Sequence, residues 1–324
     1  MPSTASTLEP DPRPDPKLDQ QPRIGRRAFT AFTSFTAVAA LAPAWAQGGA
    51  QAPLTPLSRA IPRGNGERLP AVGLGTANIF DSDDDKARAA AAQVLQALVG
   101  GGARLVDTAS TYGDAEQVLG AVAADGALRE RLFIATKLER PDPAELQRSL
   151  SRLRVKQVDL LQLHNVRDAG QSLARFREWK AQGLCRYVGI TTTYRGSYPA
   201  LEAVLAREEP DFVQVDYSID NREAEARILP LAAEHRAAVL TALPFGRGRL
   251  FRAVRDKPVP DWAAGFAGSW AQFFLKYLLG DERVTAVIPG TTSAEHMADN
   301  LGAMRGPLPD ADQRRRMAAF IDGL

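Results

Sequence analysis

The sequence is poor in cysteine and carries no large excess of charge. Cys185 is the only cysteine among the 324 residues, which excludes an internal disulfide and any cysteine-clustered zinc or iron–sulfur site. The 40 Lys and Arg residues nearly balance the 38 Asp and Glu residues, so the chain lacks the concentrated positive surface of a general nucleic-acid binder. An apolar core alone must therefore stabilise the fold, and small-molecule chemistry is favoured over nucleic-acid binding.

Residues 1–46 differ in composition from the rest of the chain. A polar stretch rich in Pro and Asp comes first, and such a composition cannot build a core. The pair Arg26-Arg27 then precedes the uncharged stretch 28–46, which ends in the small-x-small cleavage pattern "AWA". This arrangement resembles a twin-arginine export signal. A membrane anchor is the alternative, but the stretch is short, rich in Thr and Ser, and interrupted by a proline, which disfavours a spanning helix.

The export signal has consequences for the location of the protein. The twin-arginine pathway carries proteins that are already folded, so the chain would be a transient partner of the twin-arginine translocase. We expect cleavage after Ala46 and a periplasmic mature protein without a stable membrane span. Residues 47–59 are interpreted as a linker. We expect the mature protein to be a monomer.

From residue 60 onward, short apolar runs alternate with helix-like segments. Asn65-Gly66, between extended flanks, predicts a tight hairpin turn. Eight strands are expected after it, at residues 71–76, 104–109, 132–137, 158–164, 187–191, 211–218, 238–245 and 285–291. The alternation predicts parallel strands with crossover helices. Eight such units predict a (β/α)8 TIM barrel with an N-terminal β-hairpin closing its bottom.

Polar residues end the apolar strands, where the active sites of such barrels lie. They are Thr76, Asp107, Lys137, His164, Thr191, Gln214 and Thr291. A lone Lys or His at a strand end is usually solvated or structural. Asp107, Lys137 and His164, however, end three successive strands, and Tyr112 follows Asp107 closely. Their convergence at one barrel mouth indicates catalysis.

The chemistry of such a cluster is coherent. A phenol is a poor proton donor near neutral pH unless a neighbouring cation favours its anion. Lys137 would supply that cation, and Asp107 would pair with it. His164 could hydrogen-bond a carbonyl oxygen and orient it, while Tyr112 protonates the oxyanion as it forms.

Several segments together resemble the aldo-keto reductases. They follow the family's order over residues 61–304 and read "LPAVGLGT", "RLVDTASTYGDAEQVLG", "LFIATK", "SLSRLRVKQVDLLQLHN", "YVGIT", "VQVDYS", "LPFGRGRL" and "VIPGTTSAEHMADN". The resemblance implies an oxidoreductase of class EC 1.1.1.- on residues 60–324, which reduces an aldehyde or ketone with NADPH, NADH being possible. It also implies that Asp107, Tyr112, Lys137 and His164 form the catalytic tetrad.

The resemblance further implies a set of cofactor-binding residues. Thr191, Thr192 and Gln214 would hold the nicotinamide, in place of the family's usual Ser-Asn pair and Gln. The residues for the pyrophosphate and the adenosine phosphate would be Gly246, Arg247, Gly248 and Arg249, and Pro289, Gly290, Thr291, His296 and Asn300. Gly290 and His296 stand where relatives often carry Lys and Arg.

The chain departs from its relatives around the nicotinamide and the substrate. The aromatic residue that often stacks under the nicotinamide is missing at residues 242–243, which leaves Phe245 or Tyr217 as substitutes. Ala77 and Asn165 stand where many relatives carry tryptophan, so the pocket should be less aromatic. Ile79, Phe80 and the segment around Arg222 are candidates for its rim.

Two other functions are compatible with parts of this pattern. A nucleotide-binding sensor on the same barrel would explain an exported chain that has no obvious way to regenerate a soluble cofactor, although the complete tetrad argues against it. A metal-dependent barrel hydrolase requires clustered ligands. His235 and His296 lie in helix-like segments without metal-ligand spacing, so we expect no metal.

Overall fold

The computed structural model describes residues 55–124, 126–166 and 169–324. The expected export signal and the linker up to residue 54 lie outside these residues. The described part opens with an antiparallel hairpin of β1 (Ser58–Ala60) and β2 (Arg68–Pro70), so the first strand includes the last residues assigned to the linker. Asn65 and Gly66 have φ of 49° and 89°, the left-handed pair of the expected tight turn.

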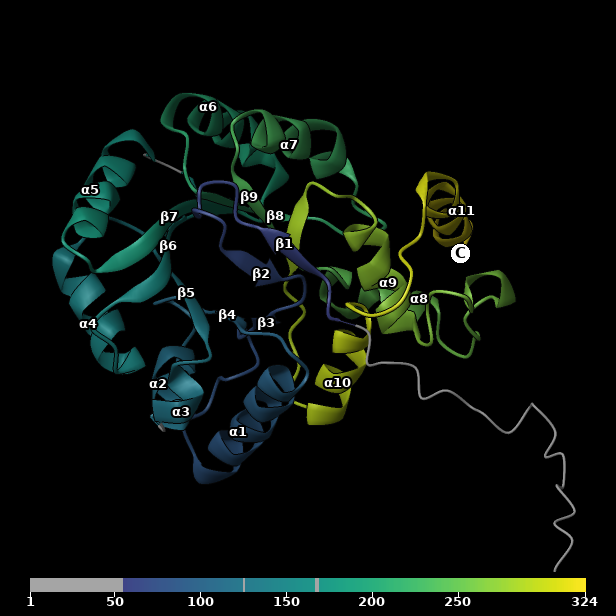
Figure 1. Ribbon diagram of the computed structural model, residues 1–324, viewed down its shortest axis with the longest axis horizontal. Coiled ribbons are helices and arrows are strands. Elements are labelled where there is room, and N and C mark those ends of the chain that lie inside the picture. Colours follow the sequence, from purple (N-terminus) through teal and green to yellow (C-terminus); the bar gives the residue numbers. More distant parts are fainter. Residues whose placement is uncertain (1–54, 125, 167–168) are drawn as a thin grey trace, which may run out of the picture. The chain divides into compact units, whose positions relative to one another are not determined.

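Eight further strands form one parallel sheet in the described residues. They are β3 (Leu74–Gly75), β4 (Leu105–Asp107), β5 (Phe133–Leu138), β6 (Val158–His164), β7 (Cys185–Thr192), β8 (Phe212–Asp216), β9 (Ala238–Ala242) and β10 (Val284–Val287). Neighbours in the sheet follow the chain order from β3 to β10. Parallel bridges from Val72 to Val287 and from Gly75 to Gly290 join the first and last strands. The expected (β/α)8 fold is confirmed, and Figure 1 looks along the barrel.

Helices follow the strands and surround the sheet (Figure 1). They are α1 (Asp85–Gly100), α2 (Ala115–Val122), α3 (Gly126–Arg129), α4 (Pro143–Leu153), α5 (Ala169–Ala181), α6 (Tyr198–Glu208), α7 (Glu223–Glu234), α8 (Arg249–Ala253), α9 (Trp270–Leu279), α10 (Ala294–Gly302) and α11 (Ala311–Asp322). Several begin at a side-chain cap: Asp84, Asp142, Ser269 and Ser293 each accept an N–H of the first turn. Local sequence thus determines where these helices start.

The interior of the barrel is closed at its bottom by the hairpin. Ile61 and Leu69 belong to the same buried cluster as Phe133, Tyr187 and Phe212, which point inward from the strands. The opposite faces of the strands pack against the helices in a second, larger cluster. With its bottom sealed, the barrel is open only at the carboxyl ends of the strands, which is where a site can form.

Some strands are shorter than the expected ones. β9 ends at Ala242, because Leu243 turns the chain with a φ of 54°. β10 covers only Val284–Val287 of the expected run to residue 291. None of the helices in the described part is both long and apolar enough to span a membrane.

Candidate active site

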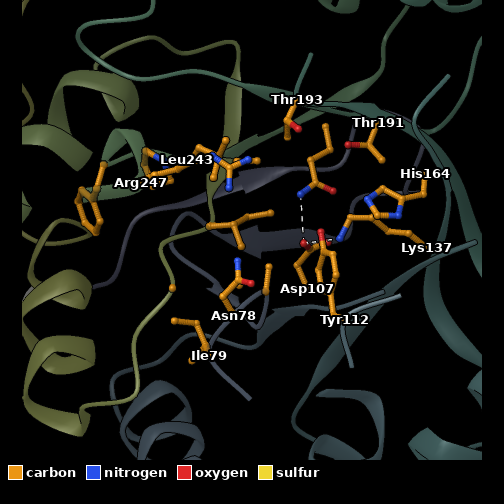
Figure 2. Close-up of a pocket in the computed structure, with 18 of the residues that line it drawn as sticks. Asn78, Ile79, Asp107, Tyr112, Lys137, His164, Thr191, Thr193, Leu243 and Arg247 are labelled. Atoms are coloured by element: carbon orange, nitrogen blue, oxygen red, sulfur yellow. Dashed lines mark hydrogen bonds and ion pairs between the residues drawn. The ribbon is translucent and has the colours of Figure 1, made fainter. Parts of the chain in front are cut away.

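The tetrad expected from the sequence meets at the mouth of the barrel. Asp107 ends β4, Lys137 lies near the end of β5 and His164 ends β6. Tyr112 lies in the loop between β4 and α2, held by backbone hydrogen bonds from its N–H to Ala109 and from the next helix to its carbonyl. Figure 2 shows the four side chains converging on a cavity of about 580 Å³.

The ammonium of Lys137 is completely enclosed. Its Nζ lies 2.6 Å from Oδ2 of Asp107 and donates to the carbonyl of Thr108 at 2.8 Å. Burial lowers the pKa of Lys137, but the Asp107 carboxylate and then Tyr112 raise it by more, so the pKa stands above its ordinary value. Lys137 is therefore a fixed cation at neutral pH.

Tyr112 lies between this cation and the histidine. Nζ of Lys137 is 5.0 Å from the centre of the phenol ring, and the His164 ring meets the phenol edge-on at 5.6 Å. Tyr112 also lines the cavity and is half-buried. Its hydroxyl is thus the one group of the tetrad that combines a labile proton, an adjacent fixed cation and access to a ligand.

His164 is a neutral imidazole at neutral pH. Burial, followed by the charge of Lys137, lowers its pKa to about 4. Its Nδ1 lies 3.0 Å from Oε1 of Glu139 and 3.3 Å from Oγ1 of Thr111. The contact with Glu139 is therefore a hydrogen bond and not an ion pair. When Nδ1 instead accepts from Thr111, the ring proton lies on the other nitrogen and is free for a ligand.

The expected nicotinamide residues are brought to the same cavity, with one exception. Thr191 and Gln214 line it, but Thr192 does not. The hydroxyl of Thr192 accepts the N–H of Tyr194 at 3.2 Å, and Thr193 lines the cavity instead. Successive strand residues face opposite sides, so Thr191 and Thr193 share a face that Thr192 cannot reach. The sequence pair was placed correctly, but the second hydroxyl is wrong by one residue.

Gln162 of β6 is a functional candidate that the sequence reading missed. Its Nε2 donates to Oδ1 of Asp107 at 3.2 Å and to Oε1 of Gln214 at 2.9 Å. It precedes His164 by two positions in the strand, so the two-residue alternation puts both side chains on one face. That spacing was the available signal.

The loop after β9 contributes only part of its expected set. Arg247 and Gly248 line the cavity, and no side chain among the described residues pairs with the Arg247 guanidinium. Arg249 points elsewhere, because its guanidinium pairs with Asp220. Gly246 is buried with a φ of 55° and shapes the turn without lining the cavity. Arg247 is therefore the cation that can meet a phosphate here.

A second pocket of about 410 Å³ adjoins the first and shares Phe245 and Gly290 with it. As expected from the sequence, Thr291, His296 and Asn300 line it. Pro289 is not among the lining residues, and its carbonyl accepts the N–H of Gly75. The described residues that line this pocket include no Lys or Arg, so a phosphate there would meet neutral donors.

The remaining expectations about the pocket walls divide evenly. Ala77, Ile79 and Asn165 line the cavity, and Phe245 lies where a stacking ring is needed. Tyr217 is wrong as a substitute, because it is fully buried with its hydroxyl donating to Glu225. Two rim candidates are also wrong: Phe80 is buried in the apolar core, and Arg222 pairs with Asp322.

Backbone strain gathers around the cavity. Four lining residues other than glycine have left-handed φ values: Asn78 at 56°, Asn165 at 62°, Leu243 at 54° and Arg247 at 54°. Asn tolerates this conformation, whereas Leu and Arg do so at a cost of order 1–3 kcal/mol each. Such strain typically persists where a fixed backbone is needed for a ligand.

Metal-binding groups are absent from the part of the chain that the structure describes. No three His, Cys, Asp or Glu side chains there are arranged to hold an ion. Cys185 lies in β7, and burial raises the pKa of its thiol to about 12. The thiol therefore stays protonated at neutral pH, and the side chains left for chemistry are those of the cavity.

Comparisons with known proteins agree with this geometry. A model of the Aldo/keto reductase family matches residues 71–320. The methylglyoxal reductase DkgB of Salmonella typhimurium is 30% identical over 272 residues, which are 78% of this chain and 93% of that protein. An aldo-keto reductase of Klebsiella pneumoniae, solved in complex with NADPH, has a TM-score of 0.66 at 23% identity, covering 82% of this chain and 95% of that one. A thermostable aldo-keto reductase, solved with the inhibitor epalrestat, has a TM-score of 0.68 at 26% identity and covers 81% and 99%.

Proposed function

The chain belongs to the aldo/keto reductase family, and on that premise we propose that it reduces an aldehyde or ketone to the alcohol, or catalyses the reverse oxidation, with NADPH or NADH. The observation that carries the proposal is the buried Lys137–Asp107 pair beneath the cavity-lining Tyr112, with His164 beside it. The NADPH complex of the Klebsiella relative supports the choice of dinucleotide.

The cavity residues fit such a cofactor. Two adjoining pockets accommodate an extended molecule, and the tetrad lines only the first of them. Thr191 and Gln214 offer a hydroxyl and an amide near the tetrad, Arg247 offers a cation, and the second pocket begins at Phe245 and Gly290. Because that pocket lacks Lys and Arg among its described residues, NADH stays a candidate beside NADPH.

The reaction follows from the residues of the tetrad. When bound, the reduced nicotinamide supplies a hydride to the carbonyl carbon. Tyr112 donates its proton to the carbonyl oxygen, so that the product is a neutral alcohol. Lys137 stabilises the phenolate that is left, and Asp107 holds the ammonium in place. His164, protonated on the nitrogen away from Thr111, donates a hydrogen bond to the same carbonyl oxygen and orients it.

A panel of aldehydes and ketones tests the proposed activity. Purified protein should oxidise NADPH or NADH when one of these carbonyls is present, followed at the nicotinamide absorbance. Tight binding of a dinucleotide without turnover of any carbonyl would contradict the reductase and support a sensor on the same barrel.

Arg247→Ala should weaken dinucleotide binding about 10- to 100-fold, because a charge-assisted phosphate contact is worth about 1–3 kcal/mol. Titration by nicotinamide fluorescence measures the change. Arg249→Ala is the matched control, since it removes the same charge from a neighbouring position whose guanidinium pairs with Asp220. Equal affinity of wild type and Arg247→Ala for both NADPH and NADH would remove the loop from the site.

We also propose that residues 1–46 direct export by the twin-arginine translocase, with cleavage after Ala46 and a periplasmic mature protein. The support is the order of Arg26-Arg27, an uncharged stretch and a small-x-small pattern in the sequence. The mature protein is proposed to be a monomer without a membrane span, since one chain supplies all the described lining of the cavity.

Fusion of residues 1–46 to a folded reporter should send the reporter to the periplasm. Changing both Arg26 and Arg27 to lysine should retain it in the cytoplasm, because the pathway is read through the arginine pair. Fractionation and immunoblotting measure the distribution. Export that survives the double change, or that never occurs with the unchanged segment, would overturn the assignment.

A further inference from the structure

Three buried polar side chains form a closed ring of hydrogen bonds beneath the cavity. Gln162 Nε2 donates to Oδ1 of Asp107 at 3.2 Å and to Oε1 of Gln214 at 2.9 Å, and Gln214 Nε2 donates to Oδ2 of Asp107 at 3.1 Å. The three side chains are 0%, 3% and 4% exposed for Gln162, Gln214 and Asp107. They come from the alternate strands β6, β8 and β4, which contribute to one layer of a barrel interior. The dashed lines at Asp107 in Figure 2 include the bond from Gln214.

The carboxylate of Asp107 determines which way both amides point. Paired with Lys137 at 2.6 Å, Asp107 is ionised and can only accept hydrogen bonds. Gln162 and Gln214 must therefore turn their NH2 groups toward it. The second N–H of Gln162 then goes to Oε1 of Gln214, which fixes the amide of Gln214 at both ends. One N–H of Gln214 is left outside the ring, and Gln214 lines the cavity.

The ring is retained at a cost to the barrel interior. Oε1 of Gln162 is buried and has no hydrogen-bond partner in the described part of the chain. A buried acceptor without a partner is destabilising, and Leu or Met at this position would avoid the penalty. Gln162 therefore contributes something that an apolar residue could not, and the two N–H bonds are what it alone supplies.

We propose that Gln162 is a positioning residue that fixes the donor and acceptor ends of Gln214 and so links the tetrad carboxylate to recognition of a primary amide in the cavity. On the proposed function, that amide is the carboxamide of the nicotinamide ring. Without Gln162, the Gln214 amide keeps only its bond to Asp107 and can rotate. The cavity then loses its defined donor, while the contacts of Arg247 and of the second pocket are unchanged.

Gln162→Met should therefore weaken NADPH binding about tenfold, the effect of losing one buried hydrogen-bonded contact. Binding of 2′-phospho-ADP-ribose, which lacks the nicotinamide, should stay within about twofold, because that probe does not meet Gln214. Thr241→Val is the matched control: the Thr241 hydroxyl is also buried without a partner among the described residues, but it is not in the ring. It should leave both affinities unchanged.

A double-mutant cycle with Gln214→Met makes the test specific. If Gln162 acts through Gln214, each single variant should lose about tenfold in NADPH affinity and the double variant about the same, not about 100-fold. Equal weakening of NADPH and 2′-phospho-ADP-ribose by Gln162→Met would show a merely structural role and overturn the inference. So would unchanged NADPH affinity. A wild-type protein that binds neither NADPH nor NADH would overturn the proposed function instead.

Gln162→Glu keeps the inference testable if the Met variant does not fold. It preserves the shape of the side chain, but when ionised it has no hydrogen to donate and faces the Asp107 carboxylate. NADPH binding should be weak near pH 8 and recover as the pH falls and the new carboxyl becomes protonated. Affinity for NADPH that matches wild type at every pH would contradict the inference.

Discussion

Tyr112→Phe should lower the rate of carbonyl reduction by about 100-fold or more, the usual scale of a general acid. The ring and its contacts with Lys137 and His164 persist, and only the proton donor is removed. Dinucleotide affinity should therefore stay within about threefold of wild type. Single-turnover oxidation of bound NADPH with 4-nitrobenzaldehyde, followed at the nicotinamide absorbance, measures the rate.

Tyr194→Phe is the matched control for this variant. Tyr194 follows β7 near the barrel mouth but is 70% exposed and does not line the cavity. Loss of its hydroxyl should leave the rate unchanged. Reduction of the aldehyde by Tyr112→Phe at the wild-type rate would exclude Tyr112 as the acid.

Lys137→Met should have an effect of similar size on turnover, about 100-fold, because the phenolate loses the charge that stabilises it. The variant should also be less stable by about 3–5 kcal/mol, since Asp107 stays buried without its cation. Because the folded-state pKa of Lys137 is raised above 10.5, the contribution of the pair is complete below that pH and is lost only as the pH rises beyond it. Urea unfolding at neutral pH and single-turnover kinetics measure the two effects.

A second buried lysine separates stability from chemistry. Lys276 is 2% exposed and donates to the backbone carbonyls of Arg305 and Pro307, away from the cavity. Lys276→Met should lower the free energy of unfolding while leaving the rate per folded molecule unchanged. If Lys137→Met also reduced aldehyde at the wild-type rate per folded molecule, the role given to its charge would be wrong.

The sequence was sufficient to predict the barrel and the tetrad, because both are recorded in local patterns. Apolar runs gave the strands, and Asp107, Lys137 and His164 were visible as polar residues at the ends of those runs. Their convergence then followed from parallel strands that share one open end. The distances and burial of the tetrad needed the structure.

The misplaced residues share a different origin. Thr192 and Tyr217 lie at or beyond strand ends, where the two-residue alternation no longer fixes the face of a side chain. Arg249 was drawn away by an ion pair with Asp220, a tertiary contact that local sequence does not contain. Gln162 was hidden because it lies inside an apolar run, where a polar residue reads as an interruption of the strand and not as a site.

The central claim is that this barrel transfers a hydride to a carbonyl while Tyr112 supplies the proton. It is tested most directly by one turnover of the protein loaded with NADPH deuterated at the transferable C4 position, mixed with 4-nitrobenzaldehyde and analysed by mass spectrometry. The account predicts one equivalent of alcohol per dinucleotide oxidised, with deuterium on the carbinol carbon, and almost no product from Tyr112→Phe in the same time. Bound dinucleotide that stays reduced with this and every other carbonyl offered, or alcohol that carries no deuterium, would contradict it.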